Sequence, residues 1–179
     1  ANLQAANRRP KTEAETRCLI DEQLRQVGWE ADTTVLRYSK GCRPAKGHNL
    51  AIAEWPTDKV PGNEEKGYAD YALFIGTELV GFIEAKKWDT DISSVISYQC
   101  KDYARAVRKC DVEYLLGQWQ DFKVPFVFAA NGRPYVQQLQ IKSGIWFADL
   151  RQSGNMPRAM AGWPSPLGLK EMLQENTAE

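Results

Sequence analysis

The sequence has few of the residues that build zinc sites and disulfide scaffolds. It contains four cysteines, none in a CxxC pair, and a single histidine, His48. A zinc site needs several Cys or His ligands at close spacing, so this class of site is excluded. The cysteines are predicted to be free thiols.

Long apolar runs are also missing. No stretch approaches the roughly 20 apolar residues that a membrane-spanning helix needs. The opening residues, ANLQAANRRPK, lack the apolar segment of a secretion signal. We therefore expect a cytoplasmic protein without a membrane partner.

Neither sign of charge is in excess. Lysine plus arginine and aspartate plus glutamate number 23 each, which gives a formal net charge of zero at pH 7. A domain that binds DNA on its own usually carries a clear basic excess. If this chain acts on DNA, we expect other parts of a larger assembly to hold that DNA.

What is present predicts one α/β domain with a central mixed β-sheet flanked by helices. The length of 179 residues and the hydrophobic content of 43% suit a single globular core. We predict a flexible arm over residues 1–11 and the folded domain over 12–152. Residues 153–179 are predicted to be a Pro/Gly-rich connector with a short helix.

Apolar periodicity and turn residues predict the individual elements. A capping box at Thr12–Glu15 predicts the start of the first helix, and Gly28 predicts its end. Residues 57–66 are predicted to be an exposed loop, because they contain Pro61, Gly62 and several charges. Strands are predicted at 33–38, 49–55, 68–75, 79–85, 126–130, 135–139 and 145–150, and further helices at 92–109 and 169–174.

Ionisable residues stand near one end of two neighbouring apolar runs. Asp70 lies in the run 68–75, Glu84 lies in the run 79–85, and Lys86 follows it. Runs that are apolar at almost every position are typical of central strands covered on both faces. Charged groups in such strands need a compensating partner or a function.

The register of the predicted hairpin decides whether Asp70 and Glu84 meet. A two-residue loop, Gly76–Thr77, would by itself send their side chains to opposite faces of the sheet. A three-residue loop, or one compensating bulge, places Asp70 opposite Glu84 and Phe74 opposite Val80. We predict this second register, because it pairs small with large residues on the shared face.

Lys86 lies two residues after Glu84, so strand alternation places both side chains on one face with Asp70. Two carboxylates offer the oxygen ligands that Mg²⁺ prefers, and the bound ion can activate water for attack on phosphorus. Lys86 would orient that water or offset developing charge. The same spacing also fits an ordinary ion-pair cluster at a sheet edge, and spacing alone does not decide between the two.

The helix after the hairpin carries Gln99 and Tyr103 at a spacing of one turn, within its apolar stripe. An amide that faces a sheet must find a partner. We therefore expect these two side chains either to support the carboxylate site or to be a satisfied core amide and a packing residue.

Further candidates flank this site in the sequence. Glu13 or Glu15 on the first helix is an additional metal-ligand candidate, although first-turn glutamates are also favoured simply by the helix dipole. Lys87 and Trp88, directly after the lysine of the motif, are candidates for contacts with DNA. Arg133, just after the Asn131-Gly132 turn dipeptide, is a weaker one.

The joint pattern resembles a known family. The segments GYADYALF, GFIEAKK, SYQCKDYA, FVFAANGRPY and SGIWFADL occur in this order. Together they are similar to the amino-terminal nuclease region of type I restriction enzyme R subunits (HsdR), across nearly the whole chain. Ala69 stands where the PD-(D/E)XK motif name has proline, a departure that removes no ligand.

The resemblance implies a restriction-endonuclease-like PD-(D/E)XK fold and Mg²⁺-dependent DNA cleavage, with Mn²⁺ as a substitute. It implies Asp70, Glu84 and Lys86 as catalytic residues, supported by Gln99 and Tyr103 of a QxxxY element. It also implies an acidic residue on the first helix. The expected partners are DNA and the modification and specificity subunits.

The resemblance implies that ATP is used by a motor domain. No GxxxxGK(S/T) loop occurs in this sequence, so we expect that motor not to be part of it. Two alternatives remain open at this stage. One is a stand-alone repair or junction nuclease of the same fold, which would require its own basic DNA surface. The other is a catalytically silent module that docks partner subunits.

Overall fold

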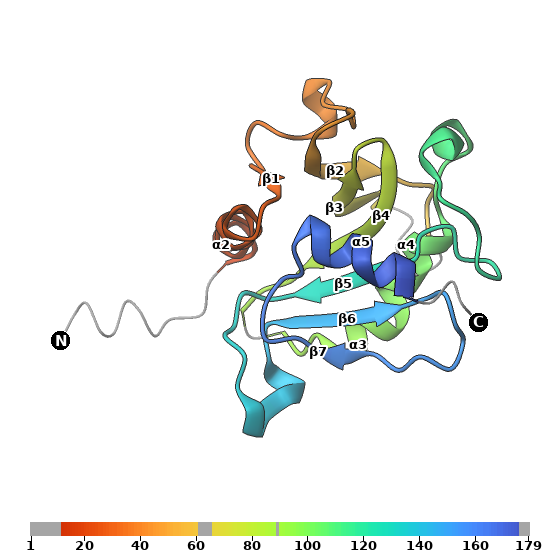
Figure 1. Cartoon of the computed structure of the whole chain (residues 1–179). Helices are drawn as coiled ribbons and strands as arrows, with labels where there is room; N and C mark the ends of the chain where they lie inside the picture. The colour runs from red at the N-terminus through yellow and green to blue at the C-terminus, as the bar shows by residue number, and fades with distance from the viewer. Residues whose placement is uncertain (1–11, 61–65, 89, 176–179) are drawn as a thin grey trace.

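The computed structural model describes residues 12–60, 66–88 and 90–175. At its centre is a mixed seven-stranded sheet in the order β1-β2-β3-β4-β5-β6-β7, with helices on both faces (Figure 1). The predicted α/β class is confirmed. The strands are β1 (Glu30–Ala31), β2 (Asn49–Pro56), β3 (Tyr68–Ile75), β4 (Glu78–Ala85), β5 (Phe126–Ala130), β6 (Ile145–Asp149) and β7 (Arg158–Ala159).

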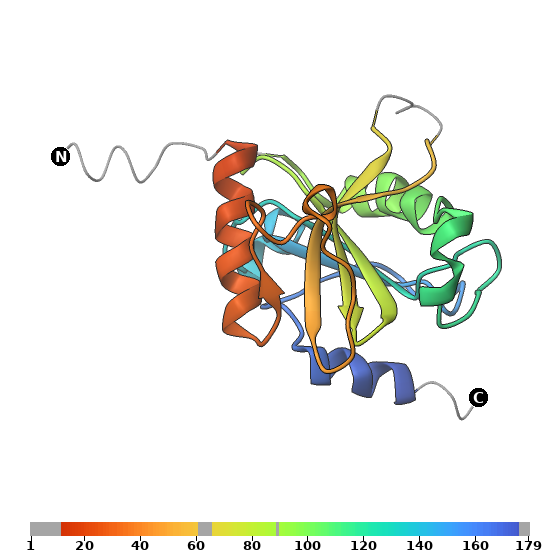
Figure 2. The ribbon, with the colours of Figure 1, turned by 90° about the horizontal axis from the view of Figure 1, so that it is seen from above.

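The helices lie on both sides of the sheet. Helix α2 stands on one side, and the continuous helical segment formed by α3, η2 and α4 stands on the other (Figure 2). No helix in the described ranges is long and apolar enough to cross a membrane. The bounds are α2 (Glu13–Gln26), η1 (Tyr38–Lys40), α3 (Ser93–Val95), the π-helical turn η2 (Ile96–Cys100), α4 (Lys101–Arg105), η3 (Lys109–Tyr114), η4 (Gln137–Lys142) and α5 (Pro166–Glu175).

Each face of the sheet carries its own hydrophobic core. Phe74 and Phe82 point to the face covered by η2 and α4, where they join one buried cluster with Tyr103. Tyr71 and Ile83 point to the opposite face and join the cluster that includes residues of α2 and α5. This alternation is the period-two pattern of strands covered on both sides.

The β3–β4 hairpin has a two-residue turn, Gly76–Thr77, and a bulge on β4. Leu73 pairs with Gly81 while Phe74 pairs with Leu79, so Val80 is the extra residue. The predicted bulge is therefore confirmed. The three-residue loop and the pairing of Phe74 with Val80 are wrong, because the bulge itself restores the register.

The predicted strand over 33–38 is wrong. Asp32 turns the chain there, since its carboxylate accepts hydrogen bonds from the amides of Thr34 (2.9 Å) and Val35 (3.2 Å). Local side-chain bonds of this kind compete with strand pairing. The parallel edge strand is instead the short β1, before this turn.

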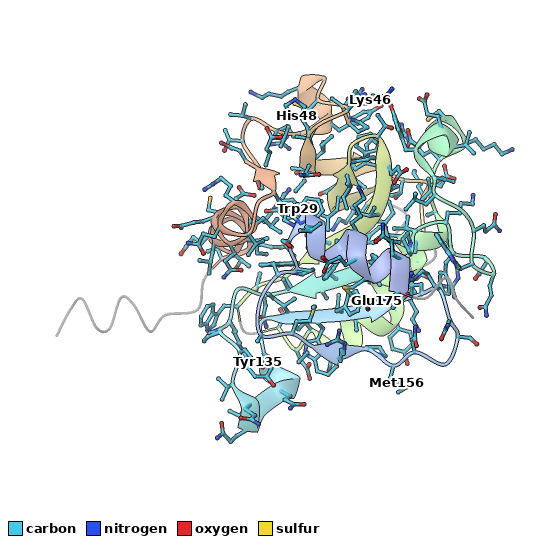
Figure 3. All side chains as sticks on the ribbon, viewed as in Figure 1. Trp29, Lys46, His48, Tyr135, Met156 and Glu175 are labelled. Carbon is cyan, nitrogen blue, oxygen red and sulfur yellow. The ribbon has the colours of Figure 1, made fainter. Side chains whose placement is uncertain are left out.

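The predicted strand over 135–139 is also wrong, and the helix predicted over 92–109 ends at Arg105. In place of the strand, the chain forms the 3₁₀ helix η4. Tyr135, in the loop before η4, is 36% exposed (Figure 3). Apolar residues in this loop lack a sheet face to pack against, so their alternation does not produce a strand.

The C-terminal segment packs onto the domain. Leu169 of α5 is fully buried in the α2-side core, and the Trp29 indole donates to the backbone oxygen of Pro164 (2.9 Å). A connecting role toward a motor domain stays a prediction. The arm predicted over residues 1–11 lies outside the described residues.

Asp21 organises a buried polar network between α2 and β3. Its carboxylate accepts from the Thr33 amide (2.8 Å), the Thr33 hydroxyl (2.8 Å) and the Tyr71 hydroxyl (2.6 Å). Asp21→Ala removes the acceptor of these three donors, so we expect the free energy of unfolding to fall by about 3 kcal/mol. Urea denaturation measures this. The exposed neighbour provides the control: Glu22→Ala should change it by less than about 0.5 kcal/mol, and equal losses would contradict the prediction.

Candidate active site

Asp70 of β3 and Glu84 of β4 meet on one face of the sheet. They stand one step beyond the Tyr71–Ile83 pair of the register, on the face that η2 and α4 cover. Both carboxylates are buried, with exposed fractions of 4% for Asp70 and 1% for Glu84. The predicted convergence of the two acids is what the structure shows.

Asp70 is held by β4 and by a lysine. Its Oδ2 accepts the backbone amide of Ala85 (2.7 Å), and its Oδ1 accepts the ammonium of Lys66 (3.3 Å). One oxygen is thus fixed by the sheet, which orients the whole carboxylate. The other oxygen faces the shared pocket.

The two carboxylate oxygens of Glu84 have very different surroundings. Oε1 lies 2.5 Å from Lys66 Nζ, 3.6 Å from Lys86 Nζ and 3.5 Å from Gln99 Nε2. Oε2 is buried and has no hydrogen-bond partner in the described part of the chain. A buried acceptor without a partner is costly and calls for a ligand.

The helical segment over the site brings in the two residues of the predicted QxxxY element. Gln99 lies in the π-helical turn η2, and its amide nitrogen lies 3.4 Å from the Tyr103 hydroxyl. Such turns occur often at functional sites. Gln99 thereby links Tyr103 to Glu84. The hydrogen-bond partners expected for the Gln99 amide are therefore present.

Burial dominates the electrostatics of the pocket. Burial and then repulsion from Asp70 raise the pKa of Glu84 from 4.5 to about 8, against the opposing effect of Lys66 and Lys86. Burial and the nearby Glu84 also raise the pKa of Tyr103. Burial and the repulsion from Asp70 therefore outweigh the two lysines and favour the protonated form of Glu84 in the metal-free domain.

The donor set suits a hard divalent cation. Two carboxylates provide oxygen ligands, and the bare Oε2 of Glu84 is available to an ion. Across the described ranges, no three His, Cys, Asp or Glu side chains form a group that could hold a metal ion by themselves. An ion here would keep several waters, which is the normal behaviour of Mg²⁺ and not of a structural zinc.

The glutamates of the first helix are not brought into this group. Glu13 is exposed, and Glu15 is partly exposed and contacts the Thr12 cap (3.2 Å). Helix α2 does reach the region through Arg17, which donates to the backbone oxygen of Asp70 (3.3 Å). A ligand role for either glutamate has no geometric support in this arrangement.

The candidate DNA contacts lie at the same end of the sheet. Lys87 is exposed, whereas Trp88 is partly buried beside the Gly132 turn. Arg133 is partly exposed and follows that turn. Gly132 has φ 80° and leaves little room toward α2, which fixes the turn's position. Contacts of these residues with DNA stay a prediction.

Lys66 is the residue that the sequence analysis missed. It was placed in an exposed loop over 57–66, yet its side chain is only 17% exposed, and Val60 is buried. The predicted exposure is wrong for Val60 and Lys66 but holds for Asp58 and Lys59, and residues 61–65 lie outside the described residues. Charge balance was the available signal, since two buried acids need more than one lysine.

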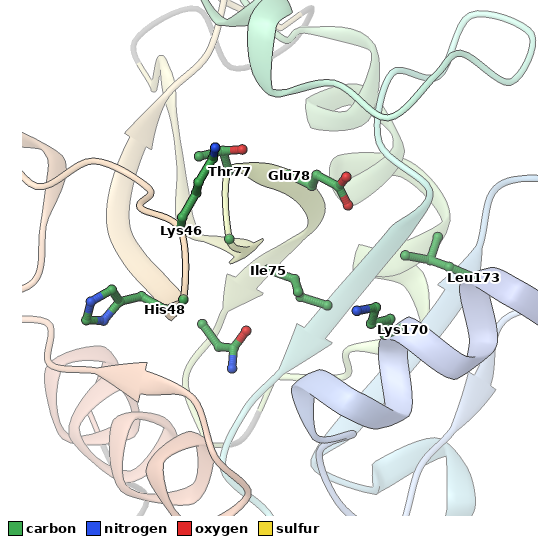
Figure 4. A pocket seen from close by; sticks show the side chains of 10 residues that line it. Lys46, His48, Ile75, Thr77, Glu78, Lys170 and Leu173 are labelled. Carbon is green, nitrogen blue, oxygen red and sulfur yellow. The ribbon is translucent and has the colours of Figure 1, made fainter.

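A hollow in the described part of the chain lies away from this site. A cavity of about 460 Å³ is found at the turn end of the β3–β4 hairpin, bordered by Lys46, His48 and Lys170 (Figure 4). Asp70 and Glu84 stand at the opposite end of the hairpin and do not line it. The candidate site is therefore the carboxylate pair and not this hollow.

Comparison with known proteins identifies the family of this chain. Residues 30–173 match the family described as "Type I restriction enzyme EcoKI endonuclease subunit second domain". The chain belongs to this family. The matched range contains Asp70, Glu84, Lys86 and the Gln99–Tyr103 pair, so the resemblance read from the sequence motifs is confirmed.

One curated relative illustrates the scale of the match. The chain is 42% identical over 186 residues to the type I restriction enzyme EcoKI endonuclease subunit of Escherichia coli (strain K12). The alignment covers 90% of this chain but 16% of that subunit, so the chain spans a small part of its relative. No solved structure matches.

Proposed function

We propose that this domain is the Mg²⁺-dependent DNA endonuclease of a type I restriction R subunit. It hydrolyses phosphodiester bonds in DNA that the translocating complex presents. The observation that carries the proposal is the buried Asp70–Glu84 pair beside Lys86, with Glu84 Oε2 lacking a partner. Membership in a family of endonuclease subunits supports it.

Each residue has a distinct task in this proposal. Mg²⁺ held by Asp70 and Glu84 would supply activation of water and a Lewis acid for the phosphoryl group. Asp70 is kept in place by the Ala85 amide (2.7 Å), so its other oxygen, which contacts Lys66, is already oriented. Lys86, 25% exposed at the pocket edge, offsets negative charge that develops on the phosphate.

Gln99 and Tyr103 position the acid and do not react. The Gln99 amide contacts Glu84 Oε1 (3.5 Å) and the Tyr103 hydroxyl (3.4 Å), which limits the rotation of the carboxylate. Packing against the helix keeps this side of the pocket dry. A dry, fixed set of charges stabilises a transition state better than a solvated one.

The balanced numbers of basic and acidic residues fit a domain whose DNA is held by other parts of the complex. With a formal net charge of zero, the chain has little electrostatic affinity of its own. We propose that the motor, which uses ATP, and the modification and specificity subunits hold the DNA. Mn²⁺ is expected to replace Mg²⁺. A stand-alone repair nuclease would need a basic surface that the composition does not favour.

Metal binding separates the enzyme from a silent docking module. We expect wild-type protein to release or absorb heat when Mg²⁺ or Mn²⁺ is titrated in a calorimeter. Asp70→Ala removes one of two charged ligands and should weaken binding by at least about 10-fold. Asp58→Ala, a change at an exposed aspartate, should leave the isotherm unchanged. Equal binding by wild type and Asp70→Ala would refute the proposed site.

A further inference from the structure

Lys66 lies between the two acids of the site. Its Nζ is 3.3 Å from Asp70 Oδ1 and 2.5 Å from Glu84 Oε1, so one ammonium bridges both carboxylates. The same ammonium stands 5.0 Å from the Tyr68 ring centroid and 5.6 Å from the Tyr103 centroid. Two acids and two aromatic faces thus surround this cation.

Lys86 does not share this position. It lies 3.6 Å from Glu84 Oε1 and is the more exposed of the two lysines, at 25% against 17%. With both lysines in place, the charges of the pocket sum to zero. A divalent cation added to that arrangement would leave an excess of two positive charges in a buried site, which is unfavourable.

We propose that Lys66 is a built-in counter-ion that holds the Asp70–Glu84 pair before a divalent cation binds and is displaced by that cation. The inference rests on the proposed Mg²⁺ site and deepens it. Lys66 stands between the two carboxylates that would hold the cation. Its long, flexible side chain lets the ammonium leave while the backbone stays in place.

Two consequences follow from this role. Lys66 lowers the affinity of the site for Mg²⁺, since the ion must first displace an ion pair. Lys66 also stabilises the metal-free domain, because without it two buried carboxylates would face each other with Lys86 as the one remaining cation among the described contacts. An ordinary structural ion pair beside the site would have the second consequence but not the first.

Calorimetric titration of the full chain with MnCl₂ tests the proposal. Lys66→Met keeps the length of the side chain and removes the charge, and we expect its affinity for Mn²⁺ to rise on the order of 10-fold. Its thermal midpoint in EDTA should fall below that of wild type, and the rise on adding Mn²⁺ should be larger. Lys59→Met, at an exposed lysine of the same segment, should match wild type in both measurements.

A charge-preserving variant keeps the test decisive if Lys66→Met does not fold in EDTA. Lys66→Arg places a guanidinium between the acids, which pairs with carboxylates through two parallel bonds. Displacing it is harder, so its Mn²⁺ affinity should fall below that of wild type. We therefore expect Lys66→Met to bind Mn²⁺ more tightly than wild type, and wild type to bind it more tightly than Lys66→Arg.

The outcomes distinguish this inference from the function on which it rests. Wild-type binding together with equal or weaker binding by Lys66→Met would overturn the counter-ion role and leave the Mg²⁺ site intact. Wild-type binding with no loss of affinity in Lys66→Arg would do the same. Absence of Mn²⁺ binding by the folded wild type and by both folded variants would overturn both proposals.

Discussion

Glu84→Gln is expected to reduce DNA cleavage by at least about 10²–10³-fold while leaving the domain folded. Glutamine has nearly the same shape as glutamate, so the packing under η2 and α4 is kept. It lacks the charge that holds a divalent cation, and it presents one oxygen where glutamate presents two. The bare Oε2 of Glu84 is the atom whose loss matters most.

The Glu84→Gln substitution should change the stability of the metal-free domain much less than its cleavage activity. Burial already disfavours the ionised form of Glu84, which raises its pKa to about 8. A neutral amide therefore costs little in the metal-free fold. Cleavage by the multi-subunit enzyme carrying the variant, together with urea unfolding of the domain, measures the two effects. Glu78→Gln changes an exposed residue on the same strand and should preserve both. Near wild-type cleavage by Glu84→Gln would remove Glu84 from the mechanism.

The stability of the metal-free domain should fall as the pH rises from about 5 to about 8. The pKa of Glu84 is 4.5 in its ordinary state and about 8 in the fold, so the folded protein keeps a proton that the unfolded chain releases. Stability from this group is complete below the ordinary pKa and is lost as pH passes through the raised value. The loss is on the order of a few kcal/mol.

The groups that face Glu84 define how this experiment is read. Asp70 adds repulsion, Lys66 and Lys86 oppose it, and the thiol of Cys100 and the phenol of Tyr103 lie close by with raised pKa values of their own. Because these groups all act on Glu84, the pH profile of the wild type alone does not isolate the contribution of Glu84. The quantity to compare is therefore the difference in the free energy of unfolding between wild type and Glu84→Gln at each pH.

Urea unfolding in EDTA at several pH values from 5 to 8 gives that difference. Subtracting the profile of Glu84→Gln removes the contribution of all other groups. We expect a falling difference with pH, and saturating Mg²⁺ should weaken or reverse it, because the ion binds the deprotonated acids. A difference that is flat or rises with pH in EDTA would contradict the assignment of a raised pKa to Glu84.

Local patterns predicted most of the site. Continuous apolar runs indicated β3, β4 and β5, and the Thr12 cap indicated α2. The two-residue spacing of Glu84 and Lys86 put both on one face, and the one-turn spacing of Gln99 and Tyr103 did the same on the helix. These relations depend on residues close in sequence, which is why the sequence could predict them.

Local patterns failed where a distant partner decided the outcome. The predicted strand at 33–38 was replaced by the turn that Asp32 caps, and Asp21, on another element, fixes the start of that turn by accepting the Thr33 amide. The predicted strand at 135–139 had no neighbour to pair with. The hairpin register depended on a bulge at Val80, which side-chain alternation permits but does not impose.

By itself, the sequence determined on which face of their own strand or helix the candidate residues stand, because side-chain periodicity is a property of the backbone. Only the tertiary structure decided that Lys66 bridges Asp70 and Glu84 and that Glu84 Oε2 is left without a partner. It also decided that Glu13 and Glu15 stay outside the group. Contacts between separate elements follow from how the layers pack, and that packing minimises free energy over the whole chain rather than over any one segment.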